Sequence, residues 1–221
     1  MNRYKIEIEL LTEAIFGSGH SVPGSVDLEI VYDEYGFPFM KAKTFKGNLR
    51  EIMKKTIHLL GYKEYKHVLK SLLGEKNNGV NTWKNLRFSD CRLTENIRNI
   101  LKYAVKAEEI EPSEIKEALT EIRSFTSIED DGSYKKGTLR HFRVIKKGLM
   151  FVVDMECERE LSDEELAVLA VSLRSLRHIG TMRTRGKGEV NCSLLLLDKG
   201  VYRDITDYYI DKLMEGVKSN A

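Results

Sequence analysis

The fold is decided by residues 162–197, whose sequence is SDEELAVLAVSLRSLRHIGTMRTRGKGEVNCSLLLL. Ser162, followed three residues later by Glu165, forms a capping box, which is typical of a helix start. Leucines then recur at helical spacing, and the helix is expected to end at His178. A basic, glycine-rich loop follows at residues 180–188, and residues 190–197 have the apolar character of a buried strand. The stretch therefore predicts a helix, a loop and a strand in succession.

The same periodicities, followed outward from this stretch, give the remaining elements. Strands are expected at residues 4–10 and 86–93, and in two hairpins at 26–32 with 37–40 and at 141–145 with 149–157. Helices are expected at residues 44–57, 63–73, 112–122 and 205–217. This order is the split βαβ of an α+β, ferredoxin-like (RRM-like) domain. We expect a single domain, residues 1–221, with insertions at about 17–40 and 124–158.

Composition excludes several classes of protein. The chain has 221 residues, of which 42% are hydrophobic and 32% charged, so it is too apolar for disorder and long enough for a sizeable core. No apolar run approaches the ~20 residues that span a bilayer, and the N-terminus lacks the apolar segment of a signal peptide. The three cysteines are widely spaced and indicate neither a disulfide framework nor a structural zinc site. We expect a cytoplasmic protein without a membrane partner.

The distribution of charge is more informative than the net charge of +2. Three windows without an acidic residue, 41–50, 135–153 and 174–187, hold 15 of the 36 lysines and arginines. Such segregation favours one face that meets a polyanion. The alternative is a solvated surface on which cations cluster by chance.

The loop at residues 180–188 has three glycines and three cations in nine residues. Glycine lets the backbone approach a ligand closely, and arginine and lysine neutralise phosphates. The spacing fits neither a Walker A loop nor a dinucleotide-binding fingerprint, and a helix precedes the loop where those motifs need a strand. The loop therefore favours RNA or phosphate binding, with an ordinary surface turn as the alternative. Trp83, also after a loop, is expected either to start a strand in the core or to stack on a base.

Four segments together resemble the RAMP superfamily of CRISPR-associated proteins. Residues 179–190 resemble its C-terminal glycine-rich loop, and residues 37–50 (FPFMKAKTFKGNLR) resemble its strand-to-helix element P-x-I-P-x-S-S-L-K-G-x-L-R. Residues 73–74 with 86–91 are similar to F-G … L-x-F-S-D-A, and residues 126–139 to the thumb hairpin that precedes F-x-V-(I)-x-x-G-x-x-F. The best match is the repeated backbone subunit of type III effector complexes, which polymerises along a guide RNA and, in active members, cuts bound target RNA.

The resemblance implies a catalytic residue. Residues 24–27 (GSVD) match the end of the family's first long Gly-rich loop, where one aspartate of active members promotes metal-dependent cleavage, so Asp27 is the expected catalytic residue. A single carboxylate does not hold a divalent cation tightly, but it can position a hydrated Mg²⁺ or Mn²⁺ ion, or the attacking 2′-OH. The alternative is a loop carboxylate that caps a turn. Asp33, six residues on, is expected to make the hairpin turn.

The resemblance also implies the RNA-binding residues. Lys46 and Arg50 lie one helical turn apart in the element that contacts the guide backbone, with solvated helix charges as the alternative. The full expected set is His20, Lys43, Lys46, Arg50, Lys135, Lys136, Arg140, Arg183, Arg185 and Lys187.

Three functions compete at this point. The first is a guide-RNA-bound endoribonuclease that cuts target RNA at Asp27, in an open helical array with copies of itself and other subunits. The second is a non-catalytic scaffold of the same kind of complex. The third is a relative that processes precursor guide RNA by metal-independent acid–base chemistry, but such relatives usually have two domains.

Overall fold

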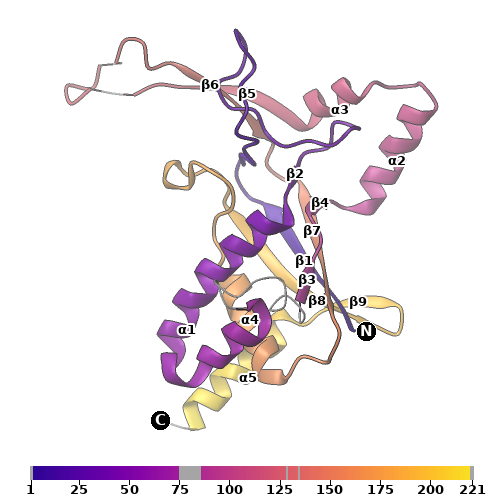
Figure 1. Ribbon diagram of the computed structural model, residues 1–221, viewed down its shortest axis with the longest axis vertical. Helices are drawn as coiled ribbons and strands as arrows, with labels where there is room; N and C mark the ends of the chain where they lie inside the picture. The colour runs from indigo at the N-terminus through magenta and orange to yellow at the C-terminus, as the bar shows by residue number, and fades with distance from the viewer. Residues whose placement is uncertain (1, 75–85, 128, 134, 220–221) are drawn as a thin grey trace.

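A computed structural model describes residues 2–74, 86–127, 129–133 and 135–219, so Trp83 lies outside the described residues. The structure is a mixed α/β fold around an antiparallel sheet (Figure 1). At its centre is β1 (Asn2–Leu10), which pairs with β7 (Met150–Cys157) on one side and with β8 (Val190–Asp198) on the other. Alternate β1 side chains, from Tyr4 to Leu10, are buried, which confirms the predicted strand.

The outer strands complete the order β2-β4-β7-β1-β8-β9, with β3 also paired to β7. They are β2 (Phe39–Met40), β3 (Leu86–Phe88), β4 (Cys91–Leu93) and β9 (Val201–Asp204), the last of which was not predicted. The strand expected at 86–93 is interrupted because two of its side chains are used elsewhere. Ser89 Oγ accepts a hydrogen bond from the backbone N–H of Asp154, and Asp90 Oδ1 accepts one from the backbone N–H of Ala42 at a helix start.

Three helices gather beside the sheet, as Figure 1 shows: α1 (Ala42–Leu73), α4 (Asp163–Ser175) and α5 (Thr206–Ser219). The two helices predicted at 44–57 and 63–73 are one element with a break at Gly61, where φ is 130°. The capping box of Ser162 and Glu165 is confirmed at the start of α4. Buried side chains of α1 and α4 pack with β1, β7 and β8 in a single core.

A second body projects from the sheet and holds α2 (Glu95–Lys106), α3 (Pro112–Leu119), β5 (Thr120–Phe125) and β6 (Arg140–Ile145) (Figure 1). The prediction that residues 141–145 pair with 149–157 is wrong. β6 pairs with β5 over six residue pairs, because both edges of β7 are occupied by β1 and by β3 and β4. The sequence analysis missed α2 altogether and placed the end of α3 three residues too late.

The hairpin predicted at 26–32 with 37–40 is reduced to a turn and isolated pairs. Only Phe39–Met40 is a regular strand, and Tyr32 forms a single bridge with Pro38. Asp33 makes the turn, as predicted, because its Oδ1 accepts the backbone N–H groups of Tyr35 and Phe37 at 3.1 Å. Residues 27 and 28, before this turn, instead form backbone hydrogen bonds with β6 of the β5–β6 hairpin, and this contact forms the candidate site.

Candidate functional site

Asp27 lies where the loop of residues 17–30 meets β6. Its backbone N–H donates to the carbonyl oxygen of His141 at 2.7 Å, and its Oδ2 accepts the backbone N–H of His141 at the same distance. The side chain is exposed and lines a pocket of about 370 Å³ with residues 21–26, Leu139 and His141. Among the described residues Oδ1 has no hydrogen-bond partner. The carboxylate is thus held by one oxygen and presents the other to the pocket.

The imidazole of His141 is oriented from the other strand of the hairpin. Its Nδ1 lies 3.0 Å from the Oγ of Ser124, so the ring shares a hydrogen bond across β5 and β6. His20, one of the expected RNA-binding residues, is exposed, and its carbonyl oxygen accepts the backbone N–H of Glu29.

Glu29 fastens the Asp27 loop to the second body, and the sequence analysis missed it. It is buried, and its carboxylate lies 3.0 Å from Arg143 Nε on β6 and 3.3 Å from Lys116 Nζ on α3. The backbone N–H of Ile30 donates to the same carboxylate at 2.9 Å. Because Glu29 lies two residues after Asp27, this ion pair holds the Asp27 loop to the second body.

A second carboxylate, Glu13, joins the same hairpin to the glycine-rich loop. It lies 2.6 Å from Arg123 Nη2 on β5 and 2.5 Å from Lys187 Nζ. Burial by itself raises the pKa of Glu13, but the hydrogen bonds from Lys187 and Arg123 outweigh it and lower that pKa from 4.5 to about 2. Lys187, predicted to bind phosphate, is therefore already ion-paired within the protein.

The glycine-rich loop is built on two close backbone approaches. At Gly188, φ is +73° and a Cβ atom would lie 1.9 Å from the carbonyl oxygen of Ile179; at Gly180, it would lie 2.5 Å from that of Ile15. The Gly188 N–H donates to the Glu13 carbonyl oxygen at 2.7 Å. These contacts leave the 3₁₀ turn Arg183–Arg185 exposed at the end of the loop. Arg183 Nη1 lies 3.8 Å from Glu51, an exposed pair of little strength.

The predicted cations of α1 lie in three different environments. Lys43 is exposed, whereas Lys46 is buried with its ammonium 6.0 Å from the centre of the Phe88 ring. Burial, and then the charge of Arg50, lower the pKa of Lys46 from 10.5 to about 8. Arg50 donates to the carbonyl oxygens of Gly74, at 2.7 Å, and of Leu73, so it caps the far end of its own helix.

A cleft runs between the N-terminal half of α1 and the glycine-rich loop. Two pockets, of about 270 and 470 Å³, share Asn48 as a lining residue. The first is bordered by Lys41 and Gly180, and the second by Arg183. Of the predicted cations, Arg183 alone lines these pockets, beside Lys41, Lys55 and Arg177, which were not predicted.

The predicted cations of residues 135–140 lie apart from this cleft, on the projecting hairpin (Figure 1). Lys135, Lys136 and Arg140 are all exposed. Lys135 Nζ is 3.8 Å from Glu129, and Arg140 donates to the Leu139 carbonyl oxygen at 3.0 Å. The hairpin therefore carries three exposed cations beside the Asp27 pocket, together with three exposed acids, Glu129, Asp130 and Asp131.

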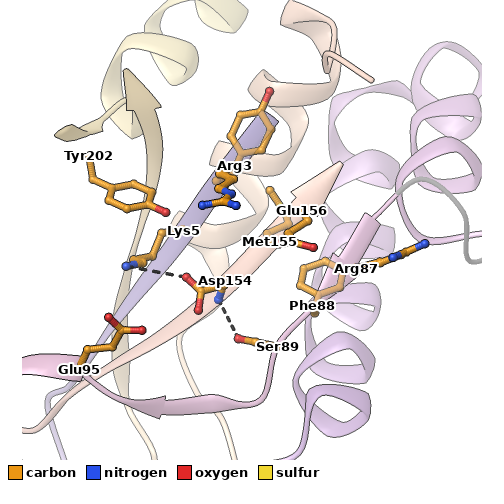
Figure 2. A pocket seen from close by; sticks show the side chains of 11 residues that line it. Arg3, Lys5, Arg87, Phe88, Ser89, Glu95, Asp154, Met155, Glu156 and Tyr202 are labelled. Atoms are coloured by element: carbon orange, nitrogen blue, oxygen red, sulfur yellow. Dashed lines mark hydrogen bonds and ion pairs between the residues drawn. The ribbon is translucent and has the colours of Figure 1, made fainter. Parts of the chain in front are cut away.

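A pocket of about 630 Å³ that was not predicted is shown in Figure 2. Three cations are matched by three carboxylates among its lining residues: Arg3, Lys5, Arg87, Glu95, Asp154 and Glu156. Lys5 Nζ lies 3.8 Å from Asp154 and 4.3 Å from the centre of the Tyr202 ring (Figure 2). This balance gives the pocket little attraction for a polyanion.

Two absences hold for the described residues. No group of three or more His, Cys, Asp or Glu side chains there is arranged to hold a metal ion. No helix in the same part of the chain combines the length and apolar character needed to cross a bilayer.

Comparisons with known proteins agree on one family. The model of the RAMP superfamily matches residues 7–191. A chain in the cryo-EM structure of the Type III-B Cmr-beta bound to cognate target RNA is 17% identical, with a TM-score of 0.62 over 87% of this chain and 96% of that chain. A chain of the Type III-B Cmr-beta apo state is 16% identical, with a TM-score of 0.62 over 90% and 98%. No curated protein sequence matches the chain.

Proposed function

Because this chain belongs to the RAMP superfamily, we propose that it is a guide-RNA-binding backbone subunit of a type III CRISPR effector complex, and that it cleaves bound target RNA at Asp27. The observation that carries the proposal is the geometry of Asp27, whose carboxylate is held by the His141 N–H at 2.7 Å and faces a pocket. We also assign the fold to the ferredoxin-like type, supported by the antiparallel order β8-β1-β7 with β3 and β4 beyond, and by α1 and α4 as the connecting helices. A cytoplasmic complex on RNA is the setting that this function requires.

Guide binding is supported by the cleft between α1 and the glycine-rich loop. Lys41 and Arg183 are exposed and line it, and the exposed Lys43 and Arg185 lie next to them on the same two elements, so that all four can contact the phosphates of a strand without reading its sequence. Lys46 can also contribute to guide binding, because burial disfavours its charged form and a nearby phosphate would stabilise that form. Lys187 and Arg50 differ from these residues, because Glu13 and the carbonyl groups at the end of α1 already hold their charges and neither side chain lines the cleft.

Cleavage is supported by the chemistry that Asp27 can perform. In the proposed step the 2′-oxygen of the target bonds to the adjacent phosphorus and loses its proton, the P–O5′ bond breaks, and the 5′-oxygen gains a proton. Asp27 positions the 2′-OH with its free Oδ1, while the His141 N–H fixes the carboxylate. A single carboxylate fits a hydrated, loosely held Mg²⁺ or Mn²⁺ ion, which supplies charge neutralisation at the phosphate when bound.

The alternative is a scaffold without catalytic activity, and one observation favours it. Oδ2 of Asp27 accepts a backbone N–H from a neighbouring strand, which is what a purely structural carboxylate does. The two functions differ in whether the charge of Asp27 matters or only its hydrogen bond.

The test is cleavage of labelled target RNA by the guide-loaded assembly, with Mg²⁺ or Mn²⁺ and with EDTA, for wild type and Asp27→Asn. Asparagine keeps an oxygen for the His141 N–H but removes the charge, so we expect guide binding to persist and cleavage to fall about 10²-fold or more. Asp33→Asn is the matched control, because Asp33 is also a loop aspartate that accepts backbone N–H groups. A guide-loaded wild type that leaves target RNA intact would make the chain a scaffold.

A further inference from the structure

His141 and Asp27 are joined through their backbones and line the same pocket. The His141 N–H donates to Asp27 Oδ2, and the His141 carbonyl oxygen accepts the Asp27 N–H, each at 2.7 Å. The Arg143 N–H then donates to the carbonyl oxygen of Leu28 at 3.1 Å, so the Asp27 loop runs along β6, as Figure 1 shows. Both residues line the pocket of about 370 Å³. Short hydrogen bonds to the backbone therefore hold the Asp27 carboxylate and His141 together at this pocket.

The imidazole of His141 is held at one nitrogen only. Its Nδ1 lies 3.0 Å from Ser124 Oγ on β5, whereas Nε2 has no hydrogen-bond partner among the described residues. A serine hydroxyl both donates and accepts hydrogen bonds, so Ser124 can hold the ring whether or not Nδ1 carries a proton. A histidine that is oriented at one nitrogen and free at the other can transfer a proton through the free one.

The proposed cleavage needs a proton donor that Asp27 does not provide. When the P–O5′ bond breaks, the 5′-oxygen is a poor leaving group unless it gains a proton. Oδ2 of Asp27 is occupied by the His141 N–H, and Oδ1 is used for the 2′-OH, so neither oxygen serves the 5′-oxygen. The pocket is otherwise lined by residues 21–26 and Leu139, whose side chains are apolar groups and serine hydroxyls. His141 is thus the one lining residue, besides Asp27, with an ionisable side chain.

We propose that His141 is the general acid of the cleavage and that Ser124 positions its imidazole. The protonated ring gives its Nε2 proton to the 5′-oxygen as the P–O5′ bond breaks. The 2′-oxygen bonds to phosphorus, and its proton passes to Oδ1 of Asp27. The products are a 2′,3′-cyclic phosphate and a 5′-hydroxyl, and the two side chains return to their starting states by exchanging one proton through water. The inference rests on the proposed function, because it names the donor of the proton that this step requires.

The test compares two target RNAs in the guide-loaded assembly with Mg²⁺. One is unmodified, and in the other sulfur replaces the 5′-oxygen at one of the bonds that wild type cuts. A thiol is far more acidic than an alcohol, so the thiolate leaves without a proton and the sulfur target needs no general acid. His141→Gln should cleave the unmodified target about 10²-fold more slowly or worse, and the sulfur target within about threefold of wild type.

Two further variants make the test independent of one substitution. Ser124→Ala should show the same pattern as His141→Gln with a smaller loss, because the imidazole remains but is no longer held at Nδ1. His58→Gln is the matched control, at an exposed histidine of α1 that does not line the Asp27 pocket, and it should cleave both targets as wild type does.

The outcomes separate this inference from the proposed function. Cleavage of the unmodified target by His141→Gln at the wild-type rate overturns the general acid. A loss of the same size on both targets shows a structural role for His141 and overturns it too. Asp27→Asn should be slow on both targets, because the 2′-OH is still the nucleophile when sulfur leaves; this result together with a fully active His141→Gln leaves the proposed function standing alone. A wild type that cuts neither target refutes both.

Discussion

Replacement of Glu13 by glutamine should weaken the fold by an amount that the structure allows us to calculate. Glu13 lies 2.6 Å from Arg123 and 2.5 Å from Lys187, and its pKa is lowered from 4.5 to about 2. A difference of about 2.5 pKa units corresponds to about 3 kcal/mol of unfolding free energy. The Arg123 side chain is half exposed, and water screens its charge, so we expect a loss of about 2 kcal/mol at pH 7 for Glu13→Gln.

The pH dependence gives the sign of this effect. Because the pKa of Glu13 is lower in the folded than in the unfolded chain, its stabilisation is complete above about pH 4.5 and is lost as the pH falls toward 2. Urea unfolding of wild type and Glu13→Gln should therefore differ most at pH 7 and converge at acid pH. A difference below about 0.5 kcal/mol at pH 7, or one that stays constant down to pH 3, would refute the reasoning.

A matched control separates stability from RNA binding. Glu165 has its pKa lowered to about 2 in the same way, by Arg159 at 2.5 Å and Ser71 after the opposing effect of burial, but it lies at the start of α4. Glu165→Gln should lose similar stability with the same pH dependence. Only Glu13→Gln releases the Lys187 ammonium, so it alone should steepen the logarithmic salt dependence of guide binding, by about 0.7 for one added phosphate contact.

Two further predictions concern the α1–loop cleft. Lys46→Met should raise the unfolding free energy at pH 7, because it removes a buried charge. The pKa of Lys46 is lowered to about 8 in the folded chain, so the stability of wild type should rise between pH 8 and about 10.5 and approach that of the variant. Urea unfolding in which the two stabilities do not converge over this range would contradict the assignment. Gly188→Ala should lower the melting temperature far more than Gly186→Ala. Both glycines have φ near +70°, but only at Gly188 would a Cβ atom meet the backbone, 1.9 Å from the Ile179 carbonyl oxygen. Equal decreases in the melting temperature of the two variants would exclude this close approach.

Local patterns predicted most of the central sheet and its helices. The alternation of Tyr4 to Leu10 decides which face of β1 is buried, and Ser162 with Glu165 sets the start of α4, because both signals depend on neighbours within a few residues. The pairing of β6 could not be predicted in this way, since burial along β6 does not alternate and its partner depends on which edges of β7 are already paired. Helix α2 was missed although Leu101 and Val105 recur at helical spacing and pack against the core, because neither is fully buried and apolar residues also lie on its exposed side.

The sequence also could not show which cations are paired within the protein, because that depends on contacts between residues far apart in the chain. Lys187 and Arg185 are two residues apart in one basic loop, yet Lys187 is paired with Glu13, 174 residues away along the chain. Arg50 is likewise used by the carbonyl groups of residues 73 and 74. Composition identifies a basic loop, but only long-range contacts decide which of its charges face solvent.

The β5–β6 hairpin has a consequence for how such a protein changes over time. Its ladder ends at the pair Phe125 and Arg140, and the chain beyond this pair extends away from the central sheet (Figure 1). Doubling the length of a free loop costs only about 0.6 kcal/mol, so residues can be gained or lost there with the carboxylate anchors left intact. The length of the β5–β6 hairpin can therefore change during evolution without a change in the central sheet.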